Sequence, residues 1–347
     1  MRTPRRFALL GAIVGSLVLS ALPASAANGG GSAGDPYYPD DGNSGYRVSH
    51  YDVHVGYDPA HTYYLDGDTT ITAKATEDLD RFSLDLKGFK VASVDINGAP
   101  AKAFSRSGAH KLDITPAKQL TKGKKFTVRV RYAGKPADEG WNTLKDGGAF
   151  VSGEPHSATS WFPSNDHPSN KATFALTATV PDGWTAIGSG LPGKTTTGKN
   201  ADGKATKTFR WHEDEPMATY LSAFAVDKFM VRTSKLTDGT PVINAYSPGN
   251  EGAQEWMERL PEIIDFLSSK FGPYPFSSAG GIAPGASDGK GEGSVSLETQ
   301  TRPTYGGMIG PLADLPMIHE NAHQWFGDSV TVADWRNGCL NECFAKY

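Results

Sequence analysis

Two histidines and a glutamate, His319, Glu320 and His323, form an H-E-x-x-H pattern near the end of the sequence. Side chains four residues apart lie on one face of an α-helix, so the two imidazoles can bind one zinc ion. Glu320 lies between them in the sequence and can reach a metal-bound water as a general base. The pattern predicts a hydrolytic zinc site in which His319 and His323 are ligands and Glu320 is catalytic.

A catalytic zinc takes three protein ligands and leaves one position for water. Residues 337–347 are predicted to begin a second helix with Asn337 as its cap, and Glu342 follows His323 after eighteen intervening residues. That separation lets the second helix pack on the first and present a carboxylate to the metal. We therefore expect Glu342 to be the third ligand of one Zn²⁺ per chain.

The residues around the pattern favour a helix. Asp314 can cap its first turn, Pro316 is tolerated there, and Gly327 suits its end. We expect Asn321 and Gln324, on the remaining faces, to serve in packing or in hydrogen bonds around the ligands. The H-E-x-x-H pattern also occurs on amphipathic helices without a metal, and Glu342 at a workable spacing is what favours a real site.

Beyond single residues, the stretch 319–327, with Trp335 and the run Leu340-Asn341-Glu342, resembles the gluzincin zinc aminopeptidases. This is the family of membrane alanyl aminopeptidase and leukotriene hydrolase. Its pattern is H-E-x-x-H-x-W-x-G, followed by a Glu within W-L-N-E-G-F-A. The resemblance implies a zinc metallopeptidase, a hydrolase whose substrates are peptides with a free N-terminus.

The resemblance implies two amine-binding carboxylates. Glu298, within the stretch 295–301, matches the Glu of the family's G-A-M-E-N edge strand, which binds the peptide's α-ammonium. Its neighbours depart from that motif, since Val295, Leu297 and Thr299 stand where the family has Gly, Met and Asn. Glu154 aligns with a position where many members hold the substrate's free amine. The alternative for Glu154 is an ordinary exposed loop carboxylate.

Other departures concern the end of the chain. Family members commonly place a transition-state Tyr some tens of residues beyond the third ligand, whereas this sequence stops five residues after Glu342. Cys339 and Cys343 replace the Trp and the Gly of W-L-N-E-G-F-A. Residues four apart on a helix are poorly placed for a disulfide, so none is expected between them, and a thiol that competes for the zinc is the alternative to sequence drift.

The first 26 residues have the features of an export signal. Arg2, Arg5 and Arg6 precede an apolar run over residues 7–22, and residues 24–26 form a small-residue cleavage site. We therefore expect a secreted protein. The formal net charge is −4 with no basic run, which argues against nucleic-acid partners, and no second apolar run is long enough to span a membrane.

Three further segments follow from composition and periodicity. Residues 27–45 are rich in Gly, Ser, Asn, Asp and Pro and are predicted to form a flexible linker. Residues 46–230 alternate in short stretches between turn residues, which predicts an all-β domain of the sandwich or saddle type. From 231 onward helical spacing enters, with a helix over 251–271 that kinks or starts at Pro261.

Together with the resemblance, these segments predict a multi-domain chain. An N-terminal all-β saddle or sandwich over 46–230 precedes an incomplete α+β thermolysin-like zinc peptidase domain over 231–347. The resemblance covers nearly all of residues 46–347 but only about the first half of the family's catalytic region, so we expect a truncated product or a fragment of a longer one. Two other functions stay open: a non-catalytic binding protein with a vestigial zinc site, and a zinc endopeptidase.

Overall fold

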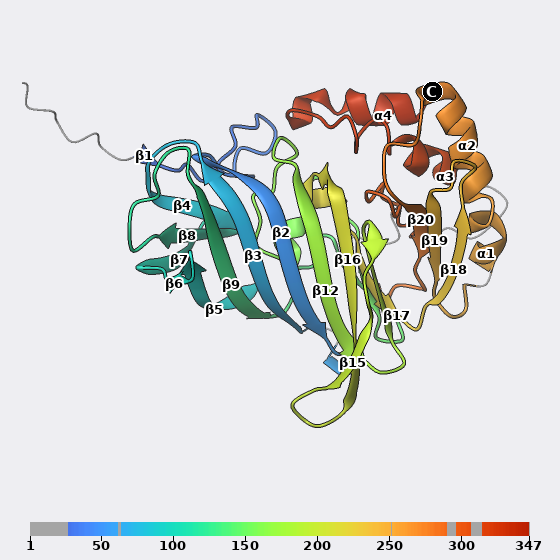
Figure 1. The fold of residues 1–347 in the computed structure, drawn as a ribbon, viewed down its shortest axis with the longest axis horizontal. Helices are drawn as coiled ribbons and strands as arrows, with labels where there is room; N and C mark the ends of the chain where they lie inside the picture. Colours follow the sequence, from blue (N-terminus) through green and yellow to red (C-terminus); the bar gives the residue numbers. More distant parts are fainter. Residues whose placement is uncertain (1–26, 62–63, 251, 290–295, 307–313, 347) are drawn as a thin grey trace, which may run out of the picture.

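The structure is a computed structural model that describes residues 27–61, 64–250, 252–289, 296–306 and 314–346 (Figure 1). The predicted export signal, residues 1–26, lies outside the described residues. Strands fill the described chain as far as Tyr246, and α-helices and a last short strand follow. This order confirms the predicted fold class, an all-β region followed by an incomplete α+β region.

A large twisted sheet forms the body of the molecule. Within the described residues it contains nine strands, and its neighbours are antiparallel except for the parallel pair β12 and β2. In spatial order the strands are β14 (Leu191–Pro192), β16 (Ala205–Met217), β12 (Ala172–Pro181), β2 (Tyr46–Tyr57), β3 (Leu65–Ala75), β9 (Lys125–Gly134), β5 (Phe89–Ile96) and β6 (Ala99–Pro100), with β15 (Thr196–Lys199) also paired to β16.

The sheet forms because its strands alternate apolar and polar residues. In β12 every second side chain is buried, and β2 and β9 follow nearly the same alternation. Successive side chains of a strand point to opposite faces, so one face of the sheet carries the apolar core and the other faces solvent. The alternation seen in the sequence is thus the alternation of burial in the fold.

Two smaller sheets share that core, which includes residues of both. One has the order β1 (Ala27–Asn28), β4 (Leu79–Asp85), β8 (Lys111–Thr115), β7 (Ala103–Ser107). The other has the order β10 (Trp141–Thr143), β11 (Ala149–Val151), β17 (Phe224–Asp227), β13 (Thr185–Gly188). Short 3₁₀ turns join the strands at η1 (Pro59–His61), η2 (Ala158–Ser160) and η3 (Thr219–Leu221).

Residues 27–45 differ from the predicted flexible linker. β1 pairs with β4, and the backbone N–H of Asn43 donates to the side chain of Asn165 at 2.7 Å. Asp35 and Asp41 are buried, and the Asp35 carboxylate accepts hydrogen bonds from three backbone N–H groups. Gly, Asp, Asn and Ser favour tight turns as well as flexible linkers. Here residues 29–44 form a packed, turn-rich segment, which we call the strap, and polar side chains such as that of Asp35 accept hydrogen bonds from its backbone.

The helical part has its own core and a three-stranded sheet. The sheet is β18 (Met230–Lys235), β19 (Pro241–Tyr246) and β20 (Ala279–Ala283), counted over the described chain, and the helices are α1 (Gly252–Met257), α2 (Leu260–Phe271), α3 (Asp314–Ala322) and α4 (Cys339–Ala345), with η4 (Trp335–Asn337) before α4. Figure 1 shows these helices gathered at one end of the molecule, beyond β16. No helix in the described ranges is long and apolar enough to cross a membrane.

The helix predicted over 251–271 is divided in two. α1 ends at Met257, and α2 begins at Leu260 with Pro261 in its first turn. Proline suits that position because its missing N–H would have no partner there. Met257 and Ile264 belong to the same apolar cluster as Met317 and Trp325, and α2 packs directly against α3.

Candidate active site

Helix α3 and the turn after it place His319 and His323 on one face. The backbone N–H of His323 donates to the His319 carbonyl at 3.3 Å, so the helical spacing continues to the second histidine. The Nε2 atoms of the two rings lie 3.1 Å apart. Gly327, with φ of +128°, ends this segment in a conformation that favours glycine, as its sequence position predicts.

Helix α4 brings Glu342 to the same point. Its Oε2 lies 3.5 Å from His319 Nε2, and its Oε1 lies 3.8 Å from His323 Nε2. The cap of this helix is Gly338, not the predicted Asn337. Asn337 instead ends η4, which begins where the Asp334 side chain accepts from the Arg336 N–H at 3.1 Å, because an aspartate caps a first turn well.

These three side chains fit a zinc ion. Ligand atoms held at about 2.0–2.1 Å around a tetrahedral zinc stand roughly 3.3 Å from one another. The separations of 3.1, 3.5 and 3.8 Å between the nitrogen and oxygen atoms bracket that value. His319, Glu320 and His323 also bring one potential ligand atom each within 4.8 Å of the others. The ligand assignment of His319, His323 and Glu342 therefore stays a prediction with suitable geometry.

Hydrogen bonds around the histidines orient them for a metal. The Nδ1–H of His323 donates to the Phe326 carbonyl at 3.1 Å, which leaves Nε2 without a proton and facing His319. Burial lowers the pKa of both histidines, and neutral imidazole is the form that binds metal. Asn321 donates to the Tyr305 hydroxyl and to the Met317 carbonyl, both at 2.7 Å. It thus makes hydrogen bonds next to the histidines, as expected for this residue.

Four carboxylates converge on the site. Burial raises the pKa of Glu320 far above its usual range, and the charges of Glu298, Glu342 and Glu154 raise it further. Such a cluster is unfavourable alone and favourable around cations, because each carboxylate keeps its charge only when an opposite charge is near. A divalent metal and a protonated amine are cations of the kind that this set suits.

Glu298 lies in the wall of the site on a hairpin. Leu297, its neighbour, pairs with Thr304, and Thr304 in turn lies beside Ile282 of β20. The Glu298 side chain is 3% exposed, and its Oε1 accepts a hydrogen bond from the Tyr220 hydroxyl at 3.3 Å. Burial raises the pKa of Glu298 to about 7. The predicted role of Glu298 in binding an α-ammonium is consistent with this position beside the metal residues.

Glu154 lies on the β-domain side of the site. Its surface is exposed, yet enough protein surrounds it that desolvation raises its pKa, followed by the charges of Glu298 and Glu342. A side chain both solvent-exposed and close to other carboxylates belongs to the rim of a site. The loop alternative and the amine-binding prediction therefore both remain compatible with its exposure, and its proximity to Glu298 favours the second.

Two buried residues of the site had no signal in the sequence. Tyr220 comes from η3 in the β-domain, and its hydroxyl accepts from Asn341, the residue before Glu342, at 3.1 Å. Asp328 follows the H-E-x-x-H segment and accepts from Gln324 Nε2 at 2.7 Å. Neither belongs to a motif. Packing of the β-domain against α4 brings Tyr220 to the site, whereas Asp328 is held locally, since its N–H donates to the His323 carbonyl at 3.0 Å.

The two cysteines differ from expectation. Cys339 and Cys343 form a disulfide, with their Cα atoms 4.8 Å apart. That separation lies within the range for disulfides, so the prediction that residues four apart are too poorly placed is wrong for α4. Neither cysteine therefore has a free thiol that could compete for the metal. The bond lies on the exposed side of α4 and links the residues on either side of Glu342 in the sequence.

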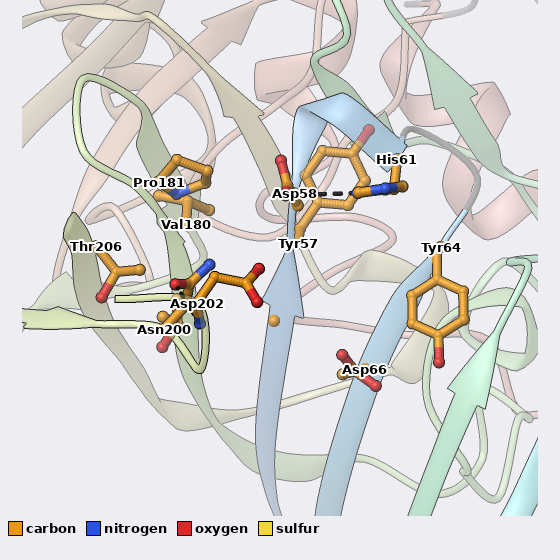
Figure 2. Close-up of a pocket in the computed structure, with 12 residues that line it drawn as sticks. Tyr57, Asp58, His61, Tyr64, Asp66, Val180, Pro181, Asn200, Asp202 and Thr206 are labelled. Carbon is orange, nitrogen blue, oxygen red and sulfur yellow. Dashed lines mark hydrogen bonds and ion pairs between the residues drawn. The ribbon is translucent and has the colours of Figure 1, made fainter. Parts of the chain in front are cut away.

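A separate hollow lies at the other end of the large sheet (Figure 2). It has a volume of about 490 Å³ and lies between the last residues of β2 and β12 and the turn after β15. His61 Nδ1 lies 3.5 Å from Asp58 Oδ2 at its edge. Its described lining includes none of the predicted site residues, so the hollow is distinct from the metal centre.

Two segments of the chain match known protein families. Residues 47–221 match the Peptidase M1 N-terminal domain, and residues 314–347 match the Peptidase family M1 domain. The first match runs from β2 through β16 to η3, and the second covers the H-E-x-x-H segment and α4.

Solved structures agree over most of the chain. An M1 zinc metallopeptidase from Deinococcus radiodurans has a TM-score of 0.78 and 32% sequence identity, over 90% of this chain and 72% of that chain. A mutant of that enzyme, with a Tyr-Ser-Ala substrate bound, has a TM-score of 0.78 and 31% identity over the same shares.

Curated relatives are much longer. The putative aminopeptidase-2 of Caenorhabditis elegans is 29% identical over 90% of this chain and 17% of its own length. Mouse aminopeptidase N is 26% identical over 82% of this chain and 33% of its own length. The chain thus spans between 17% and 33% of the length of these two relatives.

Proposed function

This chain belongs to the M1 peptidase family, and from that premise we propose that it is a secreted zinc aminopeptidase that removes N-terminal amino acids from peptides. The observation that carries the proposal is the convergence of three predicted ligand atoms, 3.1 to 3.8 Å apart, beside the buried carboxylate of Glu298. A metal centre next to an ammonium-binding carboxylate is the arrangement that an exopeptidase needs.

The residues divide the chemistry among them. A zinc ion held by His319, His323 and Glu342 would polarise the scissile carbonyl and lower the pKa of a bound water. Glu320, 6% exposed and next to the first ligand, accepts the proton of the attacking water and returns it to the leaving amine. Burial raises the pKa of Glu320, which favours the step in which it returns the proton to the leaving amine.

Two carboxylates determine where the peptide is cut. Glu298 and Glu154 bind the protonated N-terminus at a fixed distance from Glu320, so that the first peptide bond reaches the metal centre. An endopeptidase has no use for a buried carboxylate at that point, since a continuing peptide chain would leave its charge without a partner. Relatives whose names are aminopeptidases support this assignment over the endopeptidase alternative.

The decisive experiment measures zinc content and the hydrolysis of a panel of amino-acid anilides. We expect about one zinc per chain and a turnover that Glu320→Gln abolishes while the zinc remains. N-acetylated substrates serve as the control, and cleavage of these would favour a zinc endopeptidase. Zinc without turnover would assign catalysis to a longer protein than this chain, and neither zinc nor turnover would favour a non-catalytic binding protein.

Secretion is the second part of the proposal and rests on residues 1–26. The charged start, the apolar run and the small-residue end favour cleavage before Ala27. Expression in a host with a general secretion pathway, followed by N-terminal sequencing of the protein in the medium, tests it. We expect a mature chain that begins at Ala27, and retention of the whole chain in the cells would contradict it.

A further inference from the structure

Gln324 joins the metal-site helix to the loop that carries Glu298. It follows His323 directly and is fully buried. Its Nε2 donates to the Glu298 carbonyl at 3.1 Å, and its Oε1 accepts from the Thr301 N–H at 2.8 Å. One side-chain amide therefore holds both ends of the four residues 298–301.

The other half of the amide's hydrogen-bonding capacity is also used. The second Nε2 proton is donated to Asp328 at 2.7 Å, and Oε1 also accepts from the Tyr274 hydroxyl at 3.4 Å. A glutamine amide has two donors and two acceptor positions, and here each has a partner. A carboxylate of the same shape lacks both donors, and its oxygens would face two other acceptors, the Glu298 carbonyl and the Asp328 carboxyl.

Tyr220 makes a second connection to the same residue. Its hydroxyl donates to Glu298 Oε1 at 3.3 Å and accepts from Asn341 Nδ2 at 3.1 Å. Asn341 is buried and directly precedes Glu342. The Glu298 backbone is thus tied to the residue after one predicted zinc ligand, and its carboxylate is tied to the residue before another.

We propose that Gln324 and Tyr220 are positioning residues that fix the distance between the Glu298 carboxylate and the metal ligands, and thereby the distance from a peptide's N-terminus to its first peptide bond. The inference rests on the proposed function. Neither residue supplies a ligand or a proton, so their loss is expected to affect recognition of the free amine and to spare metal binding. An error of about 1 Å in such a distance lowers reactivity strongly, which is why two independent ties are useful.

The test measures peptide binding without turnover. Zinc-loaded full chain carrying Glu320→Gln is titrated by calorimetry with a dipeptide amide and with its N-acetylated form. Tyr220→Phe, which removes only the hydroxyl, and Gln324→Glu, which keeps the shape and removes the donors, are then compared in that background. Tyr132→Phe is the matched control, because its buried hydroxyl donates to the Trp161 carbonyl at 2.9 Å, away from Glu298.

We expect each variant to bind the free-amine peptide about tenfold more weakly, to bind the acetylated peptide unchanged, and to keep its zinc content and zinc affinity. Suppose that the Glu320→Gln protein distinguishes the two peptides. If both variants then bind the free-amine peptide as tightly as Glu320→Gln alone, this inference is overturned and the proposed function is not. Loss of zinc from Tyr220→Phe and Gln324→Glu would also overturn it, since the residues would then support the metal. If the Glu320→Gln protein binds the free-amine and the acetylated peptide equally well, the proposed function is overturned together with the inference.

Discussion

The Asp35 carboxylate accepts a hydrogen bond from the backbone N–H of Trp335 at 2.8 Å, across 300 residues of sequence. The same oxygen lies 3.2 Å from Nε2 of His167, and the other oxygen accepts from the N–H groups of Tyr37 and Tyr38. Trp335 begins η4, which leads into α4 and the third predicted ligand, Glu342. The strap over residues 29–44 therefore connects the β-domain to the segment that carries the predicted ligand Glu342.

Replacing Asp35 tests that connection. Asp35→Ala leaves the Trp335 N–H and His167 without their acceptor in a buried place, and we expect it to lower the free energy of unfolding by about 1–3 kcal/mol. Chemical denaturation measures this, and chelator competition should show weaker zinc binding because η4 is released. Asp40→Ala, an exposed aspartate on the same strap, is the control. If the two variants are equally stable, the hydrogen bonds of Asp35 do not stabilise the fold.

Part of this site could be predicted from local residue spacing. The rest depends on tertiary packing and could not be predicted from the sequence. His319, Glu320 and His323 could be placed because four residues make one helical turn, and Glu342 because a short connection returns a second helix to the first. The expected hydrogen-bonding role of Gln324 could be predicted in kind, but not its partner Glu298, and Tyr220 with its partner Asn341 could not be predicted at all, since these contacts are set by how loops and domains dock. The strap over 29–44 was missed because the same small polar residues build tight turns and flexible tethers.

We expect Asp227 to make the stability of the protein depend on pH, independently of the metal site. Burial, and then the neighbouring Asp146, raise the pKa of Asp227 to about 6, against a hydrogen bond from Ser247. A carboxyl with a raised folded-state pKa holds its proton more tightly when folded. The free energy of unfolding should therefore fall as pH rises from about 4 to about 6 and stay lower above that, by about 1–3 kcal/mol.

Asp227→Asn should remove that decline and stabilise the protein at pH 7, because the amide carries no charge to bury. Thermal unfolding of the two proteins between pH 4 and pH 8 measures it. Asp214→Asn, at an exposed position, controls for the change in net charge. Parallel pH profiles for wild type and Asp227→Asn would show that the carboxyl ionises freely in the fold.

The disulfide between Cys339 and Cys343 should stabilise α4 and with it Glu342. A seven-residue helix is marginal without support, and a bond that closes so small a loop contributes up to about 2 kcal/mol. We expect Cys339→Ser with Cys343→Ser to weaken zinc binding in chelator competition. Intact mass after thiol alkylation checks the starting point, with no alkylated cysteine in the native chain and two after reduction. Two alkylated cysteines in the native chain would contradict the bond.

The last prediction concerns the predicted zinc ligands themselves. His323→Ala removes a fully buried imidazole that faces both His319 and Glu342, and Glu342→Gln keeps the shape of the side chain while removing its charge. Changes in residues that only orient ligands cost about 10–100-fold in metal affinity, so loss of a ligand should cost at least a hundredfold. Zinc content after dialysis and chelator competition measure it, with His61→Ala, an exposed histidine on η1, as the control. If Glu342→Gln keeps wild-type zinc affinity while His323→Ala loses it, the third ligand is another carboxylate of the site, and Glu342 serves only to hold the histidines in place.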